Sequence, residues 1–135
     1  MIAFTTPELS ALGLAIFLHI ALMVLFAVRA NMELPSSYTM GPRDDEPPVP
    51  LSVTTARLRR AMNNSFESLI LFTPAVLLVV LTRQTSALTL SLCGVFLVAR
   101  LLYIPAYAFG WVPWRSLIWG VGLLATLAIL VIGLI

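Results

Sequence analysis

The sequence predicts an all-α integral membrane protein, a bundle of four transmembrane helices. Its residues are 60% hydrophobic and only 10% charged, whereas charged residues make up about a quarter of an ordinary soluble domain. The mean hydropathy of +1.01 points the same way. Because a hydrocarbon core about 30 Å thick takes roughly 20 apolar residues per helix, a chain of 135 residues can cross it at most about five times.

Four apolar segments have this length, and together they form a single membrane domain, residues 1–135. The first span covers about residues 9–28. Residues 29–53 contain five prolines and an acidic run, so we expect an exposed loop there, not a continuous helix. The second helix opens with polar residues and crosses the membrane over about 66–82; the third and fourth spans cover about 87–109 and 114–135.

The chain has few basic residues, eight arginines and no lysine, and its net charge is +2. Such a pattern excludes the broad basic surface of a nucleic-acid-binding protein. The single cysteine, Cys93, excludes an intrachain disulfide, and no metal-ligand spacing is present, so we expect no metal.

The loop arginines predict the orientation in the membrane. Only Arg83 lies on the side of the second loop, and the other loop arginines fall on the side of the first and third loops: Arg29, Arg43, Arg57, Arg59, Arg60 and Arg115. The positive-inside rule then places those two loops in the cytoplasm and both termini on the opposite side. Trp111, Trp114 and Trp119 fit an aromatic belt at the same cytoplasmic edge.

Polar residues recur at helical spacing on two of the four helices. On the second helix they are Arg57, Arg60, Asn64 and Glu67, and on the third they are Arg100, Tyr103 and Tyr107. Separations of three and four residues place each set on one face of its helix. The sequence therefore predicts two polar stripes near the cytoplasmic ends of these helices.

The charges of these stripes do not balance. A charged group inside the bilayer costs at least about 2.5 to 3.5 kcal/mol, so it is normally paired or faces a water-filled site. In one interpretation Arg60 and Arg100 merely pair with Glu67, while the tyrosines hydrogen-bond to these arginines and anchor the interface. In the other, the surplus guanidinium groups, including nearby Arg115, bind a ligand that carries carboxylates or phosphates.

Two sequence patterns resemble one family. Residues 60–67 read Arg-Ala-Met-Asn-Asn-Ser-Phe-Glu and follow the pattern Arg-Ala-x-x-Asn-x-x-Glu. The second pattern comprises Arg100, Tyr103 and Tyr107, followed by Gly110 and Arg115. Together they resemble the MAPEG family, the membrane-associated proteins in eicosanoid and glutathione metabolism, and especially its short bacterial members. The resemblance implies a homotrimer of four-helix subunits in the bacterial inner membrane, with glutathione bound between neighbouring subunits.

The resemblance also implies roles for individual residues. It assigns glutathione binding to Arg60, Asn64, Glu67, Tyr103 and Tyr107, with Arg100 and Arg57 on the same stripes and Arg29 as a further basic ligand. Arg115 would be the catalytic arginine that activates the thiol of this co-substrate. A guanidinium near the sulfur stabilises the thiolate, which is the nucleophilic form.

Two kinds of function remain open at this point. The first is a glutathione-dependent membrane transferase or peroxidase that acts on lipophilic electrophiles or lipid hydroperoxides, with glutathione, a hydrophobic substrate or lipid, and membrane lipids as its partners. The alternative is a non-catalytic membrane scaffold or lipid-binding subunit of the same fold, docked on a larger membrane complex. A channel or transporter would need polar residues through the full membrane depth, and the first and fourth spans have almost none.

Overall fold

The computed structural model describes residues 6–135, and most of them are helical. The long helices are α1 (Pro7–Glu33), α3 (Val53–Leu81), α4 (Ala87–Ala108) and α5 (Trp114–Leu134), and α2 (Ser36–Thr39) is a single turn. Each of the four long helices is long and apolar enough to cross a membrane. The predicted all-α membrane bundle with four spans is therefore confirmed.

The helices begin and end at recognisable local signals. Helix α1 has Pro7 in its first turn and stops at Leu34, because the residue before a proline disfavours helical backbone angles. Ser52 caps α3 by accepting a hydrogen bond from the backbone N–H of Thr55. Ser86 and Thr89 form a reciprocal capping box at the start of α4.

The first loop is shorter than the expected range of residues 29–53. Helix α1 continues to Glu33, and α2 adds a turn, so the non-helical residues of this loop are 34–35 and 40–52. The expected loop begins at residue 29, where the first apolar span ends, but no residue before Pro35 interrupts a helix, so α1 continues past the span. A helix of 27 residues is about 40 Å long, so its last turns project beyond a hydrocarbon core about 30 Å thick.

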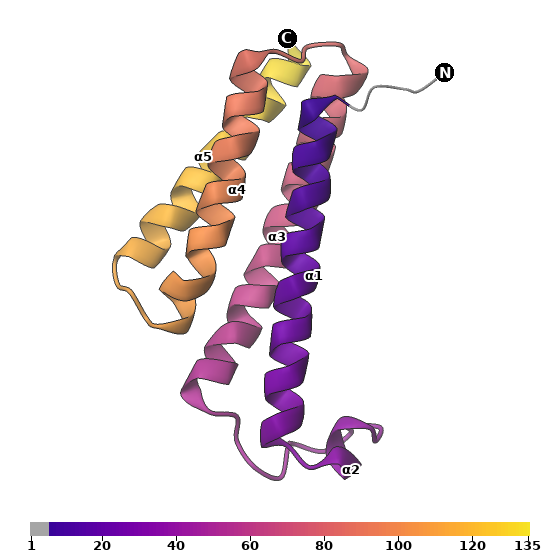
Figure 1. Ribbon diagram of the computed structural model, residues 1–135, viewed down its shortest axis with the longest axis vertical. Coiled ribbons are helices and arrows are strands. Elements are labelled where there is room, and N and C mark those ends of the chain that lie inside the picture. The colour runs from indigo at the N-terminus through magenta and orange to yellow at the C-terminus, as the bar shows by residue number, and fades with distance from the viewer. Residues whose placement is uncertain (1–5) are drawn as a thin grey trace.

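The four long helices form two antiparallel pairs, α1 with α3 and α4 with α5 (Figure 1). Helix α3 contacts each of the other three. The α1–α3 connection and the α4–α5 turn lie at one end of the bundle, called here the loop end, while the start of α1 and the C-terminus lie at the other (Figure 1). The arginine-rich loops thus share one side, as predicted; residues 1–5 lie outside the described part of the chain.

The centre of the bundle is held by close packing, which is what brings helices together where lipid removes the hydrophobic driving force. Phe72 of α3 and Phe96 of α4 stack with ring centroids 3.8 Å apart and an interplanar angle of 3°. Near the opposite end, a Cβ atom on Gly133 would lie only 3.1 Å from the backbone nitrogen of Val79. Helix α5 therefore touches the backbone of α3 there.

A carboxylate connects the end of α1 to the start of α3. The Glu33 side chain accepts hydrogen bonds from the Thr55 hydroxyl at 2.5 Å and from the Ser52 backbone N–H at 2.8 Å. Arg29, one turn earlier, lies 3.5 Å from the same carboxylate. The hydrogen bond from Thr55, then those from Ser52, hold the pKa of Glu33 below its ordinary value of 4.5.

We expect Glu33→Gln to lower the thermal unfolding midpoint of the detergent-solubilised protein at neutral pH, because the amide replaces a charged acceptor. Since the pKa of Glu33 is lower in the folded chain, its contribution to stability is complete above the unfolded value near 4.5 and is lost as the pH falls through the folded value. The difference between variant and wild type should therefore shrink in acid. Glu46→Gln, in the exposed loop, is the control, and equal effects of both variants would contradict the assignment.

Candidate functional site

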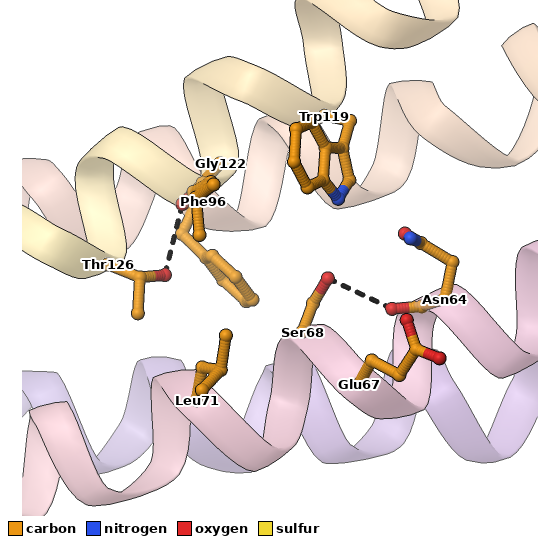
Figure 2. A pocket seen from close by; sticks show the side chains of 9 residues that line it. Asn64, Glu67, Ser68, Leu71, Phe96, Trp119, Gly122 and Thr126 are labelled. Atoms are coloured by element: carbon orange, nitrogen blue, oxygen red, sulfur yellow. Dashed lines mark hydrogen bonds between the residues drawn. The ribbon is translucent and has the colours of Figure 1, made fainter.

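The predicted polar stripes meet at a cleft between α3, α4 and α5, toward the loop end. Two adjoining cavities form it, with volumes of about 100 and 210 Å³, and Asn64 and Trp119 line both. The smaller cavity continues along α3 past Glu67 and Ser68. Figure 2 shows Trp119 of α5 facing Asn64 and Ser68 of α3 across this space. We call the combined space the Asn64 cleft.

Arg100 of α4 lines neither cavity but is buried beside the cleft, where it contacts Asn64, and only 5% of its surface is exposed. Its Nη2 donates a hydrogen bond to Asn64 Oδ1 at 3.1 Å. Its guanidinium also lies 4.3 Å from the centroid of the Tyr103 ring, a cation–π contact. Within residues 6–135, Nε of Arg100 has no hydrogen-bond partner, so this buried cation retains a free donor.

Tyr107 lies between two more guanidinium groups. The Nε atom of Arg60 donates to the Tyr107 hydroxyl at 3.2 Å, and the guanidinium of Arg115 lies 4.8 Å from the centroid of the same ring. Tyr103 meets Tyr107 edge to face at 5.5 Å. The fold thus brings an arginine from each of α3, α4 and α5 to one pair of tyrosines.

Glu67 is the carboxylate of this cleft and it is exposed. It forms no ion pair with any residue of the described chain, where Arg100 bonds to Asn64 and Arg60 to Tyr107. The expected ion pairs of Arg60 and Arg100 with Glu67 are therefore not formed in the described chain, whereas a hydrogen bond between Arg60 and a tyrosine, which the same interpretation expected, is present. Charges of both signs remain available at separate points of the cleft.

Four of the predicted ligands line neither cavity: Arg60 and Arg100, which contact lining residues, and Arg57 and Arg29, which contact other parts of the chain. Arg57 donates to the Ala108 carbonyl at 3.5 Å, and its guanidinium packs against Gly110 in the α4–α5 turn. Arg29 contacts Glu33 and the Thr55 hydroxyl. Arg57 lies on the same face of α3 as the helical spacing predicts. It does not reach the cleft, because the first turns of α3 meet the α4–α5 turn and its guanidinium donates to the Ala108 carbonyl there.

Helix α5 contributes four lining residues that were not predicted from the sequence: Ser116, Trp119, Leu123 and Thr126. Trp119 was assigned to an interfacial aromatic belt, but it lines both cavities. The signal was present, since separations of three, four and three residues place the four on one helix face. They were missed because α5 carries no charge in this stretch.

Comparison with known proteins identifies one family. A family model described as the MAPEG family matches residues 9–135, which is nearly the whole chain. Among curated proteins and among solved structures, nothing matches.

The turn at Gly110 tests how the site is held together. We expect Gly110→Ala to destabilise the fold by about 1 to 2 kcal/mol, because the glycine has φ +69° and a Cβ atom would lie 2.9 Å from Nη1 of Arg57. Gly120→Ala is the matched control, since a Cβ atom there meets nothing within 4 Å and alanine favours a helix. Unfolding by denaturant in detergent measures both, and equal stabilities would contradict the predicted strain.

Proposed function

The chain belongs to the MAPEG family, a family of membrane proteins of glutathione and eicosanoid metabolism, and we propose that it is a glutathione-dependent membrane transferase or peroxidase. Its substrates in this proposal are lipophilic electrophiles or lipid hydroperoxides. The observation that carries the proposal is the arrangement at Tyr107, where the guanidinium groups of Arg60 and Arg115 converge and neither forms an ion pair with a carboxylate of residues 6–135.

Glutathione matches the charges of the Asn64 cleft. It carries two carboxylates, an α-ammonium group and a thiol. Arginine forks bind carboxylates through paired hydrogen bonds, so Arg60 and the free Nε of Arg100 suit the two acid groups. The ammonium group suits Glu67, which has no partner ion in the described structure. In this proposal Asn64 stays bonded to Arg100 and holds that guanidinium beside the cleft.

Arg115 is the group we propose for thiol activation. An ordinary thiol has a pKa near 8.5 and is mostly protonated at neutral pH, while a nearby guanidinium favours the thiolate. The thiolate would attack an electrophilic carbon and displace its leaving group. With a hydroperoxide it would attack the terminal oxygen, so that the O–O bond breaks, an alcohol leaves and the sulfenic acid reacts with a second glutathione to give the disulfide and water.

We further propose that the active form is a homotrimer in the bacterial inner membrane, with the arginine-rich loops in the cytoplasm and glutathione between subunits. Arg60 and Glu67 are both exposed on the flank of α3. Charged groups on a membrane helix are costly unless they are covered. A neighbouring subunit on this flank would cover them and close the cleft.

Arg60 tests glutathione binding. We expect Arg60→Gln to weaken glutathione affinity about 10-fold to 100-fold, since a charge-assisted hydrogen bond contributes about 1.5 to 3 kcal/mol. Calorimetric titration of the purified protein with glutathione measures this change. Arg83→Gln, at the opposite end of the bundle, is the matched control and should bind as the wild type does. Wild-type protein that does not bind glutathione would refute the proposal.

Arg115 tests the chemical step separately from binding. We expect Arg115→Gln to lower kcat about 100-fold with a halogenated nitrobenzene substrate, as when one group that stabilises a developing anion is removed. The KM for glutathione should change little. The ultraviolet absorption of the bound thiolate should need a higher pH to appear, and Arg115→Lys should restore part of the activity. An unchanged thiolate titration would exclude Arg115 as the activating group.

The alternative, a non-catalytic scaffold or lipid-binding subunit, gives a different set of results in the same assays. It predicts that the protein folds and inserts normally but shows no conversion of electrophiles or hydroperoxides, with Arg115→Gln indistinguishable from the wild type.

A further inference from the structure

A second cavity at the loop end lies apart from the Asn64 cleft. It has a volume of about 350 Å³ and is enclosed by the last turns of α1, the loop that contains α2, and the start of α3. One wall is apolar and includes Phe26, Ala30 and Leu34; the other carries Tyr38, Arg43 and Arg59. We call it the loop pocket. It shares no lining residue with either cavity of the Asn64 cleft.

The polar wall of this pocket is held in place by the loop itself. Arg43 adopts a left-handed backbone conformation with φ 60°, which a non-glycine residue maintains only where its surroundings enforce it. Its Nε donates to the Thr39 carbonyl at 3.0 Å, and its Nη2 donates to the same oxygen. The Tyr38 hydroxyl donates to the Asp45 carbonyl. These contacts fold the loop back and direct the Arg43 side chain to the pocket.

The pocket has positive charge without a counter-charge. Arg59 makes no hydrogen bond or ion pair with any residue from 6 to 135, and it lies at least about 100° round α3 from Arg57, Arg60 and Asn64. No carboxylate lines the pocket, although acidic residues follow Arg43 in the loop. Two guanidinium groups beside a hydroxyl suit a phosphate group.

The depth of the pocket in the membrane favours the phosphate of a lipid over a free phosphate ion. If residues 9–28 occupy the hydrocarbon core, the turn of α1 that carries Ala30 and Leu34 lies at the depth of the lipid headgroups. The apolar wall then continues toward the acyl chains while Arg43 and Arg59 face the headgroup layer. We propose that the loop pocket binds an anionic phospholipid, with its phosphate at Arg43 and Arg59 and the start of an acyl chain along Phe26 and Ala30.

Native mass spectrometry of the purified full chain tests this site, with phosphatidylglycerol and phosphatidylcholine of identical acyl chains as probes. We expect the wild type to bind phosphatidylglycerol at least about tenfold more tightly than the double variant Arg43→Gln/Arg59→Gln, because two charge-assisted contacts are lost. Arg83→Gln, which removes one arginine at the opposite end, should bind as the wild type does. Equal binding of phosphatidylglycerol by the double variant, or equal binding of both lipids by the wild type, would overturn the proposal.

A second arm separates a lipid from a free anion. Inorganic phosphate in millimolar excess should not displace phosphatidylglycerol, since it makes no contact with the apolar wall. Displacement by phosphate would assign the pocket to a soluble anion and overturn the lipid. Cooperative thermal unfolding in detergent checks that the double variant is folded. Glutathione titration of the same samples keeps this site distinct from the proposed catalytic one, because the double variant should retain the affinity of the wild type.

Discussion

A guanidinium group at membrane depth must find its hydrogen-bond acceptors in the protein or in a bound ligand, because lipid tails offer none. Arg100 meets part of this requirement through the amide oxygen of Asn64 on α3 and the ring of Tyr103 on its own helix, while its Nε has no partner within residues 6–135. This hydrogen bond connects α4 to α3 beside Tyr103 and Tyr107, and with the Phe72–Phe96 stack it sets where these tyrosines lie relative to Arg60. The geometry of the cleft follows from one buried cation and the amide that accepts from it.

Much of the fold could be predicted because composition and span length leave few solutions in a bilayer. The positions of side chains that depend on contacts between helices were harder to predict from the sequence. Arg57 repeats with Arg60 at helical spacing, yet its partner is the carbonyl of Ala108, 51 positions away in the chain, and no periodicity predicts such a contact. The same holds for Glu33, whose role depends on Ser52 and Thr55 arriving at the end of α1.

The cleft was predicted on the two helices where charges revealed a stripe, and missed on α5, where they did not. Trp119 and Thr126 are compatible with an interfacial or packing role when read alone. Two neighbouring residues of α3 show how closely spaced its different faces are. Arg59 lines the loop pocket, whereas Arg60 donates a hydrogen bond to Tyr107 beside the Asn64 cleft. A single turn of helix thus presents guanidinium groups to two separate environments.

The unequal lengths of the helices have a consequence of their own. Helices α1 and α3, of 27 and 29 residues, extend past the shorter α4 and α5, of 22 and 21 residues, at the loop end (Figure 1). The bundle therefore has a step near the membrane surface, and the Asn64 cleft lies beside it. In the proposed reaction one reactant would arrive there from water and the other sideways from lipid, so turnover would follow the mole fraction of the lipophilic reactant within the membrane, not its concentration in solution.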